Sequence, residues 1–437
     1  MKILLCSQYL GDSKPVATPK IAFPLGLAYI ASMISDNDIV VFDPNIVTNP
    51  LQKLRKTIEN FNPDLVALSL RNIDGQLSFN ISSYYEPFVS MIKIIKESAP
   101  FSKLIVGGPG FTVFAEEIMK RNPEITFGIV SNGELAIVDL LKNLQHPERV
   151  KNLFFRDNGQ LHFTGLGPSP QLDSLPAPFL EAFDMSKYKQ FPYSMGIESK
   201  RGCAFNCVYC LYSCLQGSHV LLKSPKKAVD EIERLRDDYG IEHFFFVDPI
   251  FNFPREHGRK ICQEIMRRNL DIKWRAWFRS DYMNERFMVD ALNAGCDIFD
   301  FSPDGACNEA LAVLGKNMDI SDVNRTIDTI GKIENVKVGY NFMYDLPRAN
   351  LQQMVGLTRV TSKIVRTCGN KLQYLALTRI RIYPHTSIYN TALMEGKITK
   401  QTDLIPPVYY TSNSSKIQRC YASILDKLIL NRALNVT

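Results

Sequence analysis

The chain has 437 residues, of which 45% are hydrophobic and 22% charged, with a net charge of +6. At roughly 150 residues per domain this length predicts two to three domains, and the apolar fraction excludes wholesale disorder. No stretch reaches the ~18 to 20 apolar residues that a membrane-spanning helix needs, and the N-terminus has no signal-peptide layout. Lys and Arg are spread without a block of like charge, so we expect a cytoplasmic protein with neither a membrane nor a nucleic-acid partner.

The first 145 residues alternate short apolar runs with helical patterns. The runs predict strands at Lys2–Cys6, Ile39–Phe42, Leu65–Leu70, Lys103–Val106 and Thr126–Val130, with helices at Pro24–Ile34, Tyr85–Glu97, Phe114–Lys120 and Glu134–Leu144. This alternation predicts a parallel sheet covered on both faces, whose ligands bind beyond the carboxyl ends of the strands. Two of the loops there, 107–112 and 131–134, contain glycines that would let the backbone approach a ligand closely.

A proline-rich stretch of weak periodicity, residues 146–190, predicts a linker. From Tyr193 a second alternation begins, with strands at Tyr193–Glu198, His243–Val247, Lys273–Phe278, Asp297–Phe301, Lys337–Met343 and Gln373–Ile382. Six such strand–helix units predict a partial (β/α)6 barrel over residues 191–400, with its active-site loops at the carboxyl ends of the strands. Residues 401–437 form a tail with one expected helix, Ser415–Asn431.

Three of the ten cysteines stand in one loop after the first barrel strand, in the sequence Cys203-Ala-Phe-Asn-Cys207-Val-Tyr-Cys210. In a reducing cytoplasm such cysteines indicate thiols or metal ligands before disulfides. Three thiolates in one loop can hold three irons of a [4Fe–4S] cluster and leave one iron open. The alternatives are a structural zinc with Cys214 as fourth ligand, and buried thiols that serve as small hydrophobic groups.

This loop resembles the signature of the radical S-adenosylmethionine superfamily, CxxxCxxC with an aromatic residue, here Tyr209, before the third cysteine. Two later segments also resemble that family: Asn341-Phe342-Met343-Tyr344-Asp345-Leu346-Pro347, where Asp345 replaces the usual glycine, and Ile382-Tyr383-Pro384-His385-Thr386 followed by Glu395-Gly396. The resemblance implies that the open iron of the cluster binds the amino and carboxylate groups of S-adenosylmethionine.

The first domain resembles the Rossmann-like cobalamin-binding domain that precedes this core in one subclass. The matching segments are Phe23-Pro24-Leu25-Gly26-Leu27-Ala28, Gly107-Gly108-Pro109 and Gly133-Glu134. None of the 6 histidines lies in residues 1–145, so we infer base-off cobalamin without a protein imidazole on cobalt. The alternative is a sheet domain that binds no cofactor.

Arg71 stands in Ser69-Leu70-Arg71-Asn72-Ile73-Asp74, on the loop after the third strand. This segment resembles that of cobalamin-dependent tryptophan 2-C-methyltransferases, in which such an arginine faces the cobalt. A permanently charged guanidinium that does not ligate would discourage a sixth ligand and favour nucleophilic Co(I). The alternative is a surface arginine that pairs with Asp74 or Glu86 and contributes little.

Further candidate residues end strands of the second domain. Asp248 could bind the amino group of S-adenosylmethionine or reach the open iron, or could merely cap a helix before Pro254. Tyr282 could approach a substrate as a base or a stacking surface, or be an ordinary loop residue. The candidates for nucleoside or methionine contacts, each of which could equally be structural, are Arg279, Ser302, Asp304 and Asn341.

The resemblances imply a C-methyltransferase that moves a methyl group from S-adenosylmethionine through methylcobalamin to a carbon of a small-molecule or peptide substrate, with the indole C2 of tryptophan as a candidate. A reductant such as flavodoxin or ferredoxin would supply electrons. An sp³ target would require a 5′-deoxyadenosyl radical, whereas an indole-type sp² carbon permits polar transfer. The alternatives are a cobalamin-dependent cyclase or rearrangement enzyme without net methylation, and a metal-bearing binding protein without turnover. A tRNA methylthiotransferase is disfavoured, because that family needs three more upstream cysteines and residues 1–145 contain only Cys6.

Overall fold

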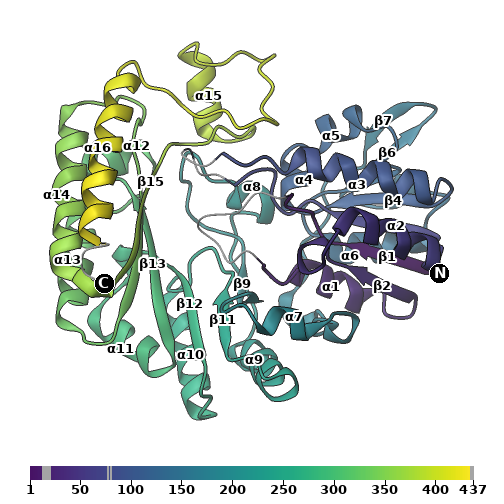
Figure 1. The fold of residues 1–437 in the computed structure, drawn as a ribbon, viewed down its shortest axis with the longest axis horizontal. Coiled ribbons are helices and arrows are strands. Elements are labelled where there is room, and N and C mark those ends of the chain that lie inside the picture. The colour runs from purple at the N-terminus through teal and green to yellow at the C-terminus, as the bar shows by residue number, and fades with distance from the viewer. Residues whose placement is uncertain (12–20, 76–77, 79–80, 434–437) are drawn as a thin grey trace. The chain divides into compact units, whose positions relative to one another are not determined.

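The computed structural model describes residues 1–11, 21–75, 78 and 81–433, which form two compact units. Unit 1 extends to Met195, and unit 2 begins at Gly196 and also includes the short segment around Ser78. Each unit is built on a sheet whose strands alternate with helices (Figure 1), so the predicted α/β fold is confirmed.

Unit 1 contains a seven-stranded sheet in the order β2-β1-β3-β4-β5-β6-β7. Its strands are β1 (Lys2–Cys6), β2 (Asp38–Phe42), β3 (Leu65–Ser69), β4 (Lys103–Gly107), β5 (Phe127–Ile129), β6 (Leu153–Asp157) and β7 (Gln160–Phe163). The first five strands are parallel, and the last two are antiparallel. Because helices cover both faces of a parallel sheet, β1, β3 and β4 are almost entirely buried.

The helices of unit 1 are α1 (Leu25–Met33), α2 (Pro50–Phe61), α3 (Tyr85–Ser98), α4 (Pro109–Val113), α5 (Ala115–Arg121), α6 (Gly133–Lys142) and α7 (Met185–Lys189). The glycine-rich segment after β4 differs from the expected open loop, since α4 begins within it at Pro109. Proline at the first helical position supplies the required φ and has no N–H to leave unpaired, so Gly108 turns the chain and the helix starts at once.

Residues 146–190 differ most from the expectation. They were assigned to a linker, but β6 pairs with β5 and β7 pairs with β6, so this stretch extends the first sheet. Short 3₁₀ turns lie around these strands at Pro147–Arg149, Leu172–Ser174 and Leu180–Ala182. The pattern of hydrophobic residues is weak in this stretch because β7 is the edge strand of the sheet and is largely exposed. The side chains of such a strand carry little hydrophobic signal.

Unit 2 contains a six-stranded sheet in the order β15-β14-β13-β12-β11-β8. These strands are β8 (Met195–Ile197), β11 (His243–Phe246), β12 (Lys273–Phe278), β13 (Cys296–Asp304), β14 (Lys337–Met343) and β15 (Leu372–Thr378), and β9 (Lys200–Arg201) and β10 (Leu221–Leu222) form a separate antiparallel pair. The five strands from β11 to β15 run parallel.

An outer layer of helices covers one face of this sheet (Figure 1). The helices of unit 2 are α8 (Tyr212–Gln216), α9 (Pro225–Tyr239), α10 (Arg255–Arg267), α11 (Glu285–Asn293), α12 (Asn308–Val313), α13 (Ile320–Lys332), α14 (Leu351–Cys368), α15 (Ser387–Met394) and α16 (Ser415–Ala433). Aromatic rings such as Phe251, Trp274 and Phe278 fill the interface between sheet and helices. Along β12 and β13 the alternate side chains, Arg275 and Asp300 among them, therefore belong to the opposite face, which is polar.

Asp345, which replaces the family's usual glycine, has a left-handed φ of 59° and a buried carboxylate. That carboxylate accepts hydrogen bonds from the backbone N–H of Ser412 (3.0 Å), the hydroxyl of Ser412 (2.6 Å) and the hydroxyl of Ser415 at the start of α16. Aspartate tolerates this backbone region. The departure from the family pattern therefore serves to hold the C-terminal helix.

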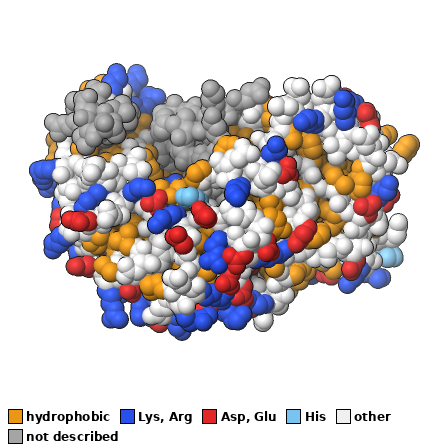
Figure 2. Space-filling view, turned by 60° about the horizontal axis from the view of Figure 1, so that its bottom comes forward, with side chains coloured by type: hydrophobic (Ala, Val, Ile, Leu, Met, Phe, Trp, Pro, Cys, Tyr) orange, Lys and Arg blue, Asp and Glu red, His pale blue; other side chains and the backbone are white. Residues whose placement is uncertain are grey.

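The outer surface carries interspersed basic and acidic side chains (Figure 2). Many are paired within one helix, for example Lys226 with Asp230 (3.0 Å) on α9. Within the described ranges, every helix is too short or too polar to span a lipid bilayer.

Candidate functional site: a cysteine loop and the switch point of a parallel sheet

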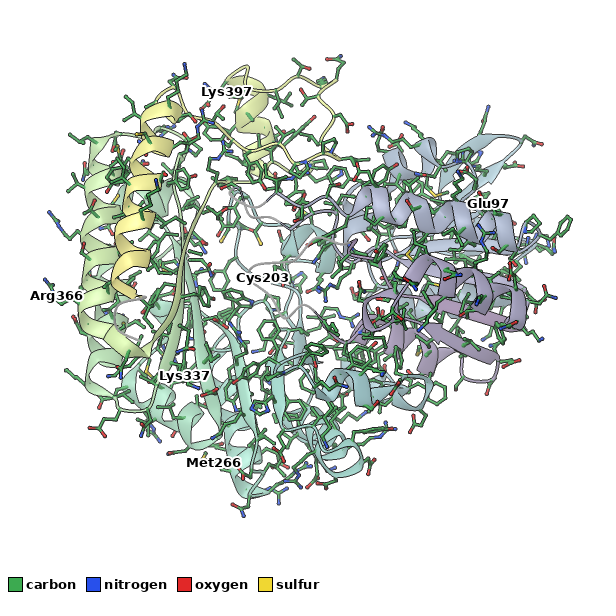
Figure 3. All side chains as sticks on the ribbon, viewed as in Figure 1. Glu97, Cys203, Met266, Lys337, Arg366 and Lys397 are labelled. Atoms are coloured by element: carbon green, nitrogen blue, oxygen red, sulfur yellow. The ribbon has the colours of Figure 1, made fainter. Side chains whose placement is uncertain are left out.

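The cysteine loop of unit 2, residues 203–210, lies between β9 and α8 and is anchored by backbone hydrogen bonds at three points. The N–H of Cys203 donates to the carbonyl of Gly217 (3.1 Å). The N–H of Val208 donates to the carbonyl of Leu314 (3.1 Å), and the carbonyl of Val208 accepts from the N–H of Ile388 (2.9 Å). In Figure 3, Cys203 lies well along the strands from Lys337, which marks the amino end of β14. The loop is thus set by distant parts of unit 2, as expected for active-site loops at carboxyl ends of strands.

The three thiols share one environment. Cys203 is buried, and Cys207 and Cys210 are half-buried. Burial raises the pKa of Cys203 and raises the pKa of Cys210 to about 12, and the charge of a Cys207 thiolate adds to both shifts. A metal centre that coordinates such neighbouring thiols would keep them deprotonated.

The donor set fits a cluster better than a single ion. In the described part of the chain, no three His, Cys, Asp or Glu side chains converge as ligands of one ion. Cys214, the fourth ligand that zinc would need, is exposed, and its Sγ lies 3.5 Å from the carbonyl of His385. In an iron–sulfur cluster each cysteine binds a different iron. Cys203, Cys207 and Cys210 would therefore hold the cluster, which supplies one-electron chemistry and an open iron when bound.

Two buried cations, Arg279 and Lys316, lie beside this loop, and only the first was expected from the sequence. Arg279, a predicted cofactor contact, is buried; it pairs with Asp281 (2.8 Å), donates to the carbonyl of Lys316 (2.6 Å), and lies 3.9 Å from the ring centre of Phe205 in the loop. Lys316 was not predicted, and its sequence signal is only a Gly-Lys pair after a short helical pattern. Its buried ammonium lies 2.5 Å from Asp304.

The predicted polar residues of β13 and β14 are brought together. Asn341 donates to the Ser302 hydroxyl (3.2 Å), and the Ser302 carbonyl accepts from Lys316 (2.7 Å). The hydroxyl of Tyr209 donates to the carboxylate of Asp304. Burial, followed by the charge of Asp304, raises the pKa of Tyr209, so this phenol stays protonated. A continuous polar contact chain thus leads from the sheet to the residue before Cys210.

Tyr282 lies in the 3₁₀ turn Ser280–Tyr282 and is half-buried in an aromatic group. Its ring meets that of Phe253 at 4.9 Å and that of Phe205 at 5.9 Å, both edge-on. It therefore packs against the cysteine loop, and its role as a base or stacking surface stays a prediction.

Asp248, the predicted contact of S-adenosylmethionine or of the open iron, makes internal hydrogen bonds in this structure. The side chain is completely buried, and its oxygens accept from the backbone N–H groups of Ser199 (2.8 Å) and Lys200 (3.1 Å) and from the Ser199 hydroxyl. The ammonium of Lys200 lies 3.8 Å away. These partners occupy the carboxylate, so Asp248 holds the turn between β8 and β9 here, and its role as a cofactor contact stays a prediction. The cap before Pro254 is not its role.

In unit 1 the strand order β2-β1-β3-β4-β5 creates a topological switch point between β1 and β3. Ligands of open parallel sheets bind at such a point, outside the carboxyl ends of the strands. Here Gln8, just after β1, exchanges two 2.8 Å hydrogen bonds with the backbone N–H and carbonyl of Asn72, just after β3. Sequence reasoning missed Gln8, because a lone glutamine gives no signal of a partner 64 residues away.

The glycines after β4 face this loop instead of open space. A Cβ on Gly108 would lie 2.8 Å from the carbonyl oxygen of Leu70 and 3.1 Å from the hydroxyl of Ser69, and one on Gly110 would lie 2.8 Å from the carbonyl carbon of Asn72. The N–H of Gly110 donates to the carbonyl of Arg71 (2.9 Å). The glycine segment thus lets the Arg71 loop, residues 69–74, pack closely on α4, which is a different use from the expected approach to a ligand.

Arg71 itself is exposed. Burial raises the pKa values of Asp43 and Tyr84, and the Arg71 guanidinium opposes both shifts, so its charge acts within this part of unit 1. The backbone of the loop is thus held by hydrogen bonds, and the Arg71 charge acts on Asp43 and Tyr84.

The rest of the sheet edge is also ordered. Ser131 has a left-handed φ of 59°, and its N–H donates to the Thr112 hydroxyl (3.0 Å). Gly133 starts α6, with its Cβ position 3.3 Å from Ile30, and Glu134 in the first turn is buried. Residues 1–145 contain no histidine that could ligate cobalt, so a corrin at this edge would be held by packing and hydrogen bonds. Ser69, Arg71, Asn72, Gly107, Gly108, Pro109, Gly133 and Glu134 stay the predicted cobalamin contacts.

Comparison with known families finds one matching family in each unit. Residues 17–141 match the B12 binding domain, and residues 197–359 match the Radical SAM superfamily. With the two sheets described above, these matches define a cobalamin-dependent radical S-adenosylmethionine enzyme, and the family implies a [4Fe–4S] cluster, cobalamin and S-adenosylmethionine as its cofactors.

Individual relatives narrow the class. An uncharacterized methyltransferase of Pyrococcus horikoshii is 26% identical over 416 residues, which cover 92% of this chain and 87% of the relative. An anaerobic magnesium-protoporphyrin IX monomethyl ester cyclase of Cereibacter sphaeroides is 26% identical over 235 residues, 51% of this chain and 36% of that protein. The methyltransferase TsrM of Kitasatospora setae has the same fold, and two of its structures each give a TM-score of 0.78. The structure with tryptophan and an S-adenosylmethionine analogue is 16% identical and covers 96% of this chain, and the structure with cobalamin and the cluster is 17% identical and covers 94%. Each match covers 82% of TsrM. The chain thus combines a B12 binding domain with a radical S-adenosylmethionine domain, and along most of its length it is similar in sequence to the Pyrococcus horikoshii relative and in fold to TsrM.

Proposed function

We propose that this enzyme transfers a methyl group from S-adenosylmethionine, by way of cobalamin, to a carbon atom of a small molecule. The observation that carries the proposal is the position of Arg71, an exposed residue on the loop at the switch point of a B12-type sheet whose residues 1–145 contain no histidine. When bound, cobalamin supplies a cobalt that accepts and passes on a methyl group, and the cluster supplies an iron for S-adenosylmethionine. The likeness to a methyltransferase along 92% of the chain supports the same reaction.

The residues of the chain would act as follows. Arg71 remains protonated and cannot ligate a metal, so it would keep one face of the cobalt without a ligand and favour its electron-rich state. Its position would be maintained by Gln8, which binds the backbone of Asn72, and by Gly110, whose N–H donates to the carbonyl of Arg71 itself. Cys203, Cys207 and Cys210 would hold the cluster, and Tyr282 would face the substrate.

An sp² carbon such as the indole C2 of tryptophan is the target that the Arg71 segment favours. Polar transfer to such a carbon needs the electron-rich cobalt that Arg71 would promote, and it forms no 5′-deoxyadenosine. We therefore expect less than one 5′-deoxyadenosine per methylated product, and a ratio of one or more would indicate an sp³ carbon.

The experiment is anaerobic reconstitution with cobalamin, iron and sulfide, followed by incubation with methyl-labelled S-adenosylmethionine, a low-potential reductant and candidate aromatic substrates. Arg71→Lys is expected to lower methylation at least about tenfold, which is about 1.4 kcal/mol of transition-state stabilisation, and to change the cobalt spectrum. Arg55→Lys is the matched control, because Arg55 is a half-buried arginine of α2 that pairs with Glu97. Wild-type behaviour of Arg71→Lys would remove Arg71 from the mechanism.

The second candidate is a cyclase or rearrangement enzyme, which the cyclase relative supports over half of the chain. Product mass separates the two: methylation adds one methylene to the substrate, whereas cyclisation or rearrangement adds no carbon. Reconstituted protein that retained neither iron nor cobalt would refute both.

A further inference from the structure

Lys316 is a buried cation whose surroundings connect it to the cysteine loop. It follows α12, and its side chain is 8% exposed. The ammonium lies 2.5 Å from Oδ2 of Asp304 and donates to the carbonyl of Ser302 (2.7 Å). The same Oδ2 accepts the hydroxyl of Tyr209, and the ammonium lies 5.6 Å from the centre of that ring. An ammonium–carboxylate–phenol chain therefore ends at the residue before Cys210.

The backbone next to Lys316 holds the same loop at a second place. The N–H of Val208, the residue after Cys207, donates to the carbonyl of Leu314. Gly315 has a left-handed φ of 67°, and a Cβ there would lie 2.9 Å from the carbonyl oxygen of Asn206, the residue before Cys207. Residues 314–316 therefore contact the loop on both sides of Cys207 and, through Asp304, beside Cys210.

A purely structural ion pair would explain only part of this arrangement. Burying an ammonium is expensive, and the pairing with Asp304 compensates that cost by tying the end of α12 to β13. Neither function requires the carboxylate to hold Tyr209 as well. Burial opposes protonation of Lys316, but the charges of Asp304 and of a Cys207 thiolate outweigh it and raise its pKa, so the group is a cation.

A cation at this place has a consequence for a cluster. Each cysteine thiolate brings a negative charge into a buried region, and one-electron reduction adds another. Coulomb attraction is strong where water is excluded. A fixed positive charge nearby therefore stabilises the thiolates, and it stabilises the reduced cluster more than the oxidised one.

We propose that Lys316 is a positioning and charge-compensating residue for the iron–sulfur cluster, which holds the cysteine loop through Asp304 and Tyr209 and raises the reduction potential of the cluster. The reduction is a one-electron step, with the electron supplied by a low-potential donor such as dithionite. This inference rests on the cluster of the proposed function and on no property of the substrate.

The test is anaerobic reconstitution of full-length variants, with iron per chain and the midpoint potential measured by dithionite titration followed by electron paramagnetic resonance. Lys316→Met is expected to bind less than half of the wild-type iron, and its remaining cluster to be reduced at least tenfold less favourably, a fall of 59 mV or more for one electron. Lys316→Arg keeps the charge and is expected to restore iron content and midpoint. Tyr209→Phe keeps the ring but removes the hydroxyl, so it is expected to lower iron content without the tenfold change.

Lys316→Met leaves Asp304 buried without its cation, so the double variant Lys316→Met/Asp304→Asn is the safeguard against misfolding. Its amide oxygen can still accept the Tyr209 hydroxyl, so we expect near wild-type iron with a smaller fall in midpoint. The fluorescence of Trp274 and Trp277, which lie in unit 2 with the substituted residues, reports whether each variant is folded. Wild-type iron and midpoint in Lys316→Met, the same losses in Lys316→Arg, or an unchanged midpoint in the double variant would each overturn the proposal. Wild-type protein without iron would instead refute the proposed function.

Discussion

The cysteine loop of unit 2 and the Arg71 loop of unit 1 both follow a strand of a sheet, but they are held in place differently. The cysteine loop contacts segments more than 100 residues away, at Leu314 and Ile388, and contributes three functional side chains of its own. The Arg71 loop contributes two charged side chains, Arg71 and the buried Asp74, and its backbone is packed between Gln8 and the glycines of the next connection.

This difference shows where each kind of site is vulnerable. A cluster loop depends on its ligands, so the loss of one ligand abolishes the site while the fold survives. The Arg71 loop depends on the absence of side chains in its neighbour, because Gly108 and Gly110 leave the space that its backbone fills. A single methyl group on the neighbouring segment should therefore disturb it.

The largest expected effect is the loss of cluster iron when one of the proposed cysteine ligands is removed. Cys207→Ala is expected to lose most of the cluster iron after anaerobic reconstitution while cobalamin binding by unit 1 is kept, since a cluster with two cysteines lacks a third anchor. Iron analysis and visible spectra measure this. Cys214→Ala is the control and should keep its iron, because Cys214 is exposed; loss of iron there would revive the four-ligand metal site.

A substitution of Asp248 distinguishes a role in holding the turn between β8 and β9 from a role at the iron of the cluster. Asp248→Asn leaves Lys200 buried without a carboxylate and is expected to lower the free energy of unfolding of unit 2 by about 3 kcal/mol. Guanidinium unfolding followed by the fluorescence of Trp274 and Trp277 measures it. The folded variant should still bind iron and S-adenosylmethionine, and a loss of S-adenosylmethionine binding without loss of stability would make Asp248 a cofactor contact.

The packing of the Arg71 loop is tested by Gly110→Ala. The added Cβ would meet the backbone of Asn72 and Ile73 below 3.0 Å, so we expect a destabilisation of about 1 to 3 kcal/mol and weaker cobalamin binding. Hydrogen exchange of the peptide 69–75 would report the local opening. Gly26→Ala is the matched control: nothing lies within 4 Å of its Cβ position in α1, and alanine favours a helix by about 0.5 to 1 kcal/mol.

The smallest effect concerns a support outside both loops. Asp345→Gly removes the acceptor of Ser412 and Ser415, while glycine relieves the left-handed backbone, so we expect a net loss of about 1 kcal/mol. Faster hydrogen exchange at the start of α16 would measure it. Asn335→Gly, at a φ of 57°, relieves the same strain without losing these bonds and should exchange like wild type. Equal behaviour of both variants would show that the carboxylate contributes nothing.

The sequence predicted most of the fold because hydrophobic periodicity is a local property. Strands such as β1 and β12 were found with their observed bounds. The stretch 146–190 was misassigned because an exposed edge strand lacks that periodicity. The start of α4 inside the glycine segment was also missed, because Pro109 can open a helix or extend a loop, and its neighbours decide between them.

By itself, the sequence determined the two α/β units, the cysteine spacing that suits a cluster and the absence of histidine from residues 1–145, since composition and short-range spacing are written along the chain. Only the tertiary structure decided that Asp248 is internal support, that Gln8 and Gly110 hold the Arg71 loop, and that Lys316 reaches Tyr209 through Asp304. These contacts join residues that are tens to more than a hundred positions apart, and they depend on buried charge and close backbone approach, which no local pattern records.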